Sequence, residues 1–193
     1  MAKRNLVLIG APPGCGKTYV AQWLAENLKP CTFLDLDMLN PLSAQICAAA
    51  GQPYDKGGAF FRAYGREPEY RTLLEIALAN LPYGGTVVVS APFTKEFREP
   101  ERLARLRESA AEQDAALHAV WVLSDRETCY ANMCRRQASR DSFKLADFDG
   151  YMDSIRFDAP EQIAGLTVLD NRAAAREKLE AALAELASRI RRG

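Results

Sequence analysis

The stretch from Asn5 to Thr18, which reads NLVLIGAPPGCGKT, decides the fold of this chain. Its apolar beginning, Asn5–Ile9, is short and nearly continuous, which is typical of a strand buried on both faces of a sheet. A turn rich in glycine and proline follows, and helical periodicity begins near Gly16. The stretch therefore predicts a strand, a tight loop and a helix, the unit from which α/β folds are built.

Residues 11–18 match the Walker A pattern except at the first position, where alanine replaces the usual glycine. Gly14 and Gly16 can take positive φ angles and approach phosphate oxygens closely, and the start of the helix favours an anion. Lys17 is expected on the β and γ phosphates, and Thr18 on a magnesium ion. The flanking strand and helix favour nucleotide binding over a glycine-rich turn that ends in Lys-Thr by chance. The residues predicted to bind ATP are Pro13, Gly14, Cys15, Gly16, Lys17, Thr18 and Tyr19.

The rest of the chain alternates short apolar runs with longer stretches of helical periodicity, which is typical of a parallel sheet flanked by helices. Strands are expected at Leu6–Ile9, Thr32–Leu36, Thr86–Ser90, Leu117–Leu123 and Leu166–Leu169. Helices are expected near Lys17–Leu28, Pro41–Ala50, Tyr70–Leu81, Glu101–Asp114, Arg126–Arg136 and Ala173–Arg191. The predicted fold class is α/β: a three-layer P-loop NTPase fold with a five-stranded parallel sheet, flanking helices and a small lid.

A length of 193 residues is typical of one domain, and we expect residues 1–193 to form one. With 48% hydrophobic and 26% charged residues, the composition excludes collagen-like and largely disordered chains. Residues 51–68 and 137–160 fit neither pattern, so both are interpreted as excursions from the sheet. The first is expected to bind substrate and the second to form the lid.

The charges balance, with 25 basic and 25 acidic residues, which argues against an extended surface for nucleic acid or membrane. A strand follows the N-terminus with no room for a signal peptide, so a cytoplasmic location is expected. The five cysteines are odd in number and lack a C-x-x-C spacing, which argues against a disulfide framework and a structural zinc site. His118, the single histidine, is expected to be structural.

The third predicted strand ends in Ser90, with no aspartate and glutamate after it to hold magnesium and activate water as in an AAA-type ATPase. Carboxylates stand instead at the end of the second strand, and strand alternation predicts that Asp35 and Asp37 both face the nucleotide. Asn40 and Pro41 supply a better helix cap than Asp37. We therefore favour a functional role for the carboxylates, which could position an acceptor hydroxyl and take its proton.

Arg135, Arg136 and Arg140 lie on or just beyond the helix that follows the fourth strand. Cations are also favoured at any helix C-terminus by the helix dipole. Beside a phosphate loop, we favour a role in which the guanidinium groups close over the nucleotide and neutralise charge on the γ phosphate. The predicted catalytic residues are Lys17, Asp37, Asp35, Arg136 and Arg140.

The phosphate loop, a second strand that ends in LDLDMLNP, and the arginines after the fourth strand together resemble the small P-loop kinases. This AAA-type ATP-binding and kinase superfamily includes gluconate kinase, shikimate kinase, polynucleotide kinase and zeta toxins. The resemblance implies a transferase that uses ATP and Mg²⁺ to phosphorylate a hydroxyl group. It also implies that Asp37 binds the acceptor and that Arg136 and Arg140 are lid arginines.

The residues that select the acceptor are left open. Basic and aromatic side chains of the first excursion fit either an anionic or ring-bearing substrate or a partly packed surface. These side chains are Tyr54, Lys56, Phe60, Phe61, Arg62, Tyr64 and Arg66. Asp170 and Asn171 fit either the adenine site or a cap of the last helix.

The leading hypothesis is a kinase, a phosphotransferase with an alcohol group of an unidentified small molecule as acceptor. One alternative is a kinase of nucleic-acid ends, which the neutral charge disfavours. Another is an ATP-binding regulatory module or slow ATPase, which the missing carboxylate pair disfavours. ATP and a hydroxyl-bearing small molecule are the expected partners, without a membrane.

Overall fold

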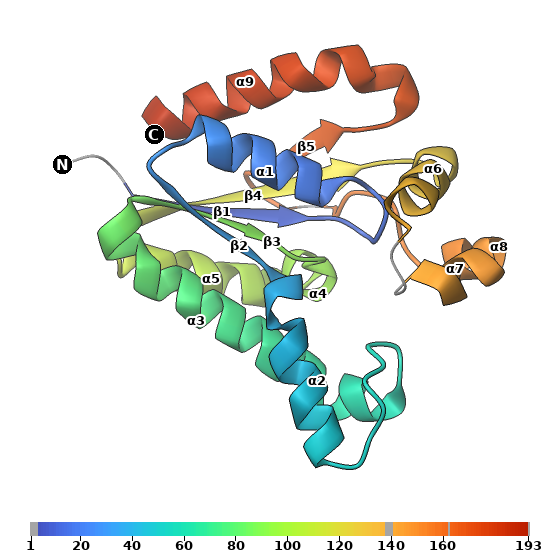
Figure 1. The fold of residues 1–193 in the computed structure, drawn as a ribbon. Helices are drawn as coiled ribbons and strands as arrows, with labels where there is room; N and C mark the ends of the chain where they lie inside the picture. The colour runs from blue at the N-terminus through green and yellow to red at the C-terminus, as the bar shows by residue number, and fades with distance from the viewer. Residues whose placement is uncertain (1–3, 138–140, 162, 193) are drawn as a thin grey trace.

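The computed structural model describes residues 4–137, 141–161 and 163–192. Its strands are β1 (Arg4–Gly10), β2 (Cys31–Asp35), β3 (Thr86–Ser90), β4 (Ala115–Leu123) and β5 (Thr167–Asp170). They form one five-stranded sheet in the order β2-β3-β1-β4-β5, and every neighbouring pair is parallel. The predicted α/β fold with a five-stranded parallel sheet is therefore confirmed (Figure 1).

Helices cover both faces of the sheet (Figure 1). On one face lie α1 (Lys17–Asn27) and α9 (Arg176–Arg192), and on the other lie α3 (Arg66–Gly84) and α5 (Pro100–Ala111). The remaining helices lie toward the carboxyl ends of the strands, where β1 leads into the phosphate loop. They are α2 (Asn40–Ala49), α4 (Thr94–Arg98), α6 (Arg126–Arg136), α7 (Ser142–Ala146) and α8 (Phe148–Asp153).

The central strand β1 shows why its sequence is almost continuously apolar. It lies between β3 and β4, and its side chains alternate between two hydrophobic cores. Val7 and Ile9 face the core under α1 and α9, whereas Leu6 and Leu8 face the core under α3 and α5. A strand buried on both faces has no position for a polar side chain except at its ends.

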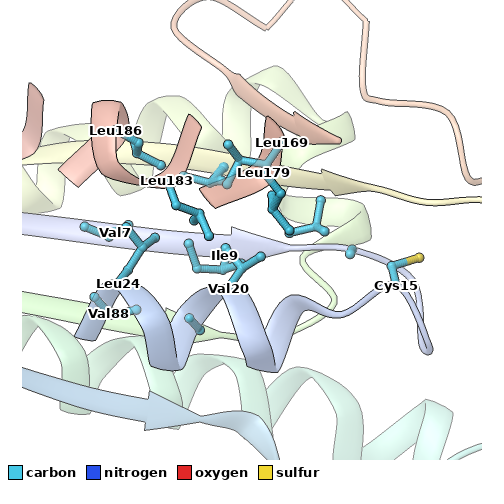
Figure 2. Packing of buried hydrophobic residues seen from close by; sticks show 14 of the residues in the cluster. Val7, Ile9, Cys15, Val20, Leu24, Val88, Leu169, Leu179, Leu183 and Leu186 are labelled. Carbon is cyan, nitrogen blue, oxygen red and sulfur yellow. The ribbon is translucent and has the colours of Figure 1, made fainter. Parts of the chain in front are cut away.

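The core under α9 contains an apolar stripe of this helix, with spacings of four, three and four residues. Leu179, Leu183, Leu186 and Ile190 are all buried. The first three point from α9 toward α1 and β1 (Figure 2). The stripe therefore fixes α9 over the helix that begins at the phosphate loop.

The boundaries differ from those expected in the segments with the weakest periodicity. The helix predicted from Tyr70 begins at Arg66, and a π-helical turn, η2 (Phe61–Gly65), precedes it. The last helix is preceded by a short 3₁₀ turn, η4 (Ala173–Ala175). The sequence pattern missed α4, because five residues are too few to show a helical period.

His118 has the structural position expected of it, since its Nε2 lies 3.0 Å from Asn5 Oδ1 and links β4 to β1. Among the helices in the described part of the chain, none is both long and apolar enough to cross a membrane.

We predict that Leu183→Ala lowers the free energy of unfolding by about 2–5 kcal/mol, because it leaves a cavity between α9 and α1. Urea denaturation monitored by circular dichroism measures this change. Glu185→Ala is the matched control on the exposed side of the same helix, and we expect a change within about 0.5 kcal/mol. Equal effects of the two substitutions would contradict the proposed role of the stripe.

Candidate active site

The loop between β1 and α1 requires glycine at two positions. Gly14 and Gly16 have φ angles of 86° and 88°, in the left-handed region that favours glycine. A Cβ at Gly14 would lie 2.8 Å from Met133 Cε, and a Cβ at Gly16 would lie 2.2 Å from Asn171 Nδ2. Among the described residues, no side chain caps the first amide groups of α1, which begins at Lys17. These amide groups are therefore available to an anion, as the sequence predicted.

Two asparagines from distant parts of the chain hold the backbone of this loop. Asn132 of α6 donates a hydrogen bond from Nδ2 to the Gly14 carbonyl oxygen at 2.8 Å. Asn171, which follows β5, is buried and donates from Nδ2 to the Cys15 carbonyl oxygen at 2.9 Å. Asn171 therefore supports the loop and does not cap η4, whose N-cap is Arg172.

A pocket of about 170 Å³ lies against the loop and the first turn of α1. It contains five of the predicted nucleotide-binding residues and Arg136, one of the two arginines predicted to be catalytic, together with four other residues. Cys15 turns its side chain into the core, where it is 1% exposed. The lining residues are Gly14, Gly16, Lys17, Thr18, Tyr19, Asn132, Arg135, Arg136, Asn171 and Arg176.

Lys17 connects this pocket electrostatically to the predicted carboxylates. Burial lowers the pKa of Lys17, and the nearby charges of Asp35 and Asp37 act in the opposite direction. Both carboxylates therefore lie near the lysine ammonium, which agrees with their predicted position at the carboxyl end of the sheet.

The local geometry at the two aspartates differs from the strand alternation that was expected. β2 ends at Asp35, whose side chain accepts a hydrogen bond from the Asp37 amide at 2.9 Å and caps the 3₁₀ helix η1 (Leu36–Leu39). Asp37 belongs to that 3₁₀ helix, so strand alternation does not set its direction. The predicted cap by Asn40 is also wrong: α2 begins at Asn40, and Asn40 Nδ2 donates to Asp37 Oδ1 at 3.3 Å.

Ser90 lies beside Asp35 in the parallel register of β3 and β2. It is completely buried, and its Oγ has no hydrogen-bond partner in the described part of the chain. Because a buried hydroxyl is normally hydrogen-bonded, this atom is available to a bound group. The end of β3 therefore offers a neutral oxygen at the position where an AAA-type ATPase has a carboxylate.

Lys56 is the residue of the first excursion that reaches Asp37. Its Nζ lies 3.9 Å from Asp37 Oδ1 and 3.1 Å from Glu69 Oε2. Glu69 is buried, and its Oε1 accepts a hydrogen bond from Ser43 Oγ at 2.5 Å. The lysine is thus anchored by a buried carboxylate next to the predicted acceptor-binding aspartate.

The aromatic residues of the excursion lie next to this lysine, whose Nζ is 5.8 Å from the centroid of the Phe61 ring. Phe60, Phe61 and Tyr64 line a small apolar pocket of about 100 Å³ between α2 and α3. Arg66 lies over the ring of Tyr70, with its Cζ 4.5 Å from the ring centroid. The segment therefore shows features of both interpretations, because Phe61 is buried, whereas Tyr64 is exposed and Lys56 reaches Asp37.

The predicted arginines have different surroundings in the structure. Arg136 lines the pocket and forms a two-point ion pair with buried Asp141, with 2.7 Å between Nη2 and Oδ1. Burial opposes ionisation of Asp141, but hydrogen bonds from Arg136 and Lys144 outweigh it and lower the pKa of Asp141. Arg135, named with Arg136 but not among the predicted catalytic residues, lines the pocket and donates to Asn132 Oδ1 at 3.0 Å. Arg140 lies outside the described residues.

The donors near the loop fit Mg²⁺, which prefers oxygen ligands. Thr18, at the start of α1, is exposed, and the charges of Asp35 and Asp37 act on its neighbour Lys17. The glycine cradle at Gly14 and Gly16 fits phosphate groups for the steric reason given above. These residues therefore suit a magnesium-bound nucleoside triphosphate.

Comparison with known proteins gives one family and several solved structures with a similar fold. The model of a family described as an AAA domain matches residues 6–158. A protein of Chloroflexus aurantiacus, provisionally described as a kinase, superposes with a TM-score of 0.70 at 16% identity, over 100% of this chain and 99% of that chain. A gluconokinase of Sinorhizobium meliloti has a TM-score of 0.56 at 21% identity, over 97% and 95% of the two chains. An APS kinase of Mycobacterium tuberculosis, solved with AMPPNP and APS, has a TM-score of 0.51 at 20% identity, over 96% and 99%. No curated protein matches this chain.

We predict that Gly16→Ala lowers the free energy of unfolding by about 1–3 kcal/mol more than Gly51→Ala does. Gly51 is a matched control because it also has a positive φ, 67°, but a Cβ there would meet nothing within 4 Å. At Gly16 the new Cβ must displace the buried Asn171 amide from the Cys15 carbonyl. Urea denaturation of the two variants measures the difference, and equal destabilisation would show that the asparagine contact contributes little.

Proposed function

This chain belongs to the AAA domain family, and from that membership and its site geometry we propose that it is an ATP-dependent kinase. It has the fold of small P-loop kinases. The reaction is transfer of the γ-phosphoryl group of ATP to a hydroxyl group of a small molecule.

The observation that supports this proposal is that Asp37 lies close enough to Lys17 of the phosphate loop for its charge to act on that lysine. Its carboxylate is half-exposed, and its charge acts on Lys17, the residue expected on the β and γ phosphates. A hydroxyl group held by Asp37 would therefore stand next to the terminal phosphate. This is the arrangement that transfer between two bound substrates needs.

In this mechanism Asp37 accepts a hydrogen bond from the acceptor hydroxyl and takes its proton as the oxygen attacks the γ phosphorus. The O–P bond to the acceptor forms while the bond from the γ phosphorus to the β–γ bridging oxygen breaks, and ADP leaves. Lys17 and the amide groups at the start of α1 stabilise the negative charge of the phosphates. Asp35 supports Asp37 through the hydrogen bond that fixes its backbone.

Thr18 is the residue proposed to hold Mg²⁺, with Asp35 as a further oxygen donor near it. When bound, this ion neutralises phosphate charge and orients the triphosphate. The chain's own contribution is the rigid loop, whose carbonyl oxygens are held by Asn132 and Asn171.

Arg135 and Arg136 are proposed to neutralise the charge that develops on the transferred group, since both line the pocket. Arg136 is held by Asp141 and Arg135 by Asn132, so neither guanidinium has to be ordered fully on binding. Arg140 keeps its proposed role as a lid arginine. Tyr19 and Arg176 provide flat surfaces for the adenine base. Arg176 Cζ lies 5.6 Å from the centroid of the Tyr19 ring, so the two side chains are already close together.

The neutral end of β3 disfavours an efficient ATPase. Ser90 cannot take a proton from water as a carboxylate can, so water near the γ phosphate has no strong base on that strand. Lys56, held by Glu69 next to Asp37, lies on the acceptor side of the site and would contact a hydroxylated acceptor.

We predict that Asp37→Asn reduces kcat for phosphorylation of the acceptor by about a hundredfold or more, the usual contribution of a general base. The dissociation constant for ATP should change by less than about threefold, because Asp37 holds the acceptor and not the phosphates. Steady-state kinetics and isothermal titration calorimetry provide the two measurements.

The matched control is Asp114→Asn. Asp114 lies just before β4, at the amino ends of the strands, and its exposed carboxylate is 3.8 Å from Arg4 Nη1. Asparagine suits its positive φ of 54°, so we expect unchanged turnover. Unchanged turnover in Asp37→Asn would remove this residue from the mechanism.

We also predict that ATP consumption rises at least about tenfold when the correct acceptor is added, since Asp37 activates a hydroxyl and not free water. The panel should contain hydroxylated metabolites, aminoglycoside-like compounds and oligonucleotide ends, with ADP release as the readout. Stimulation by oligonucleotide ends alone would favour the nucleic-acid kinase. Hydrolysis that is equally fast without any acceptor would favour the regulatory ATPase.

A further inference from the structure

Two cysteine thiols meet behind the phosphate loop. Cys15 belongs to the loop itself and lies at the end of the core beneath α9 (Figure 2). Its Sγ is 3.5 Å from the Sγ of Cys129, which belongs to α6. Both side chains are buried, at 1% and 0% exposure, and the structure has them as free cysteines.

The two thiols connect the same elements that the hydrogen bond from Asn132 to Gly14 connects. A Cβ at Gly14 would lie 3.2 Å from Cys129 Cβ, so the loop backbone rests directly on this part of α6. A covalent bond here would therefore join the nucleotide loop to the helix that carries Arg135 and Arg136.

We propose that Cys15 and Cys129 form a reversible disulfide when the protein meets a two-electron oxidant such as hydrogen peroxide, and that this bond weakens ATP binding. The disulfide itself is independent of the kinase activity proposed above. Only its effect on the affinity for ATP rests on the proposed nucleotide site.

The oxidation balances with one peroxide molecule for each disulfide. The Cys129 thiolate attacks a peroxide oxygen, the O–O bond breaks, and Cys129 sulfenic acid forms with release of one water once a proton is added. The Cys15 sulfur then attacks the sulfenic sulfur, the S–S bond forms, and the hydroxyl leaves as a second water with the Cys15 proton. Two thiols lose two electrons in total, and peroxide gains them.

The local chemistry favours Cys129 as the attacking sulfur. A hydrogen bond with the Cys15 thiol lowers the pKa of Cys129 and outweighs burial and the charge of Asp125, which act in the opposite direction. Cys15 has a raised pKa because of the same hydrogen bond and its burial, so it is the thiol that resolves the sulfenic acid.

The bond would move the loop. A disulfide has an S–S length of about 2.05 Å, so the two sulfur atoms must approach by roughly 1.5 Å from their separation here. The Cys15 carbonyl is held by buried Asn171, and the loop cannot follow the sulfur without straining that contact. The amide groups that bind phosphate are part of the same backbone, so their alignment changes with it.

The other cysteines provide internal controls. Cys134 lies on the same helix as Cys129 but is exposed, so it is the thiol that an unselective oxidant reaches first. Cys47 is buried in α2, away from the loop, and Cys31 begins β2. A disulfide specific for Cys15 and Cys129 therefore depends on their proximity and not on exposure.

The test compares wild-type protein, Cys129→Ser, Cys129→Ala and Cys134→Ser, each with and without hydrogen peroxide. Incubation must be long enough for local opening of the buried pair. After alkylation of the remaining thiols, mass spectrometry of the digest detects a peptide linked through Cys15 and Cys129. Calorimetric titration with ATP measures the dissociation constant before oxidation, after oxidation and after treatment with dithiothreitol.

We expect the linked peptide in wild-type protein and in Cys134→Ser, reversed by dithiothreitol, and in neither variant of Cys129. The dissociation constant for ATP should rise about tenfold or more on oxidation, within the usual range of coupling between two sites, only in the proteins that form the bond. By the same linkage, saturating ATP should oppose the disulfide at equilibrium in a dithiothreitol redox buffer.

The proposal would be overturned if Cys15 and Cys129 stay reduced in a sample whose Cys134 is already oxidised. It would also be overturned if the linked peptide forms without any change in ATP affinity. If the reduced protein does not bind ATP at all, the proposed function fails. The linked peptide would still decide whether the disulfide exists.

Discussion

The structure depends on how the backbone of the phosphate loop is held. Gly14 and Gly16 give the loop a conformation that other residues rarely adopt, and that conformation needs support from outside. Asn132 and Asn171 provide it by binding two successive carbonyl oxygens of the loop. With those carbonyls bound, the loop and the first turn of α1 keep a fixed arrangement of amide groups, and an anion can bind without first ordering the chain.

The parallel sheet brings the other polar residues of the site close to this loop. Parallel strands end at a common edge, so the loop after β1, Ser90 at the end of β3 and Asp35 at the end of β2 become neighbours although they are far apart in sequence. The short 3₁₀ helix after β2 then carries Asp37 toward Lys17. Lys56, anchored by buried Glu69, borders the same carboxylate.

The sequence predicted part of the geometry at the end of β2 incorrectly. Asp35 and Asp37 were expected to share a face by strand alternation, but β2 ends at Asp35 and a 3₁₀ turn sets the direction of Asp37. Asn40 was expected to cap α2, but its amide binds Asp37 instead. Both errors arise because the end of a strand depends on hydrogen bonds that a pattern of apolar residues does not contain.

The sequence alone determined the features that depend on a short stretch of residues. These are the Walker A loop, the buried strands, and the apolar stripe of α9 formed by Leu179, Leu183 and Leu186. These follow from the period of a helix or strand and from the conformational freedom of glycine. Only the tertiary structure decided which side chains support the loop, and which thiol meets Cys15, because those partners lie more than a hundred residues away along the chain. Such contacts depend on the order of strands and on how each helix packs over the sheet, which no local pattern encodes.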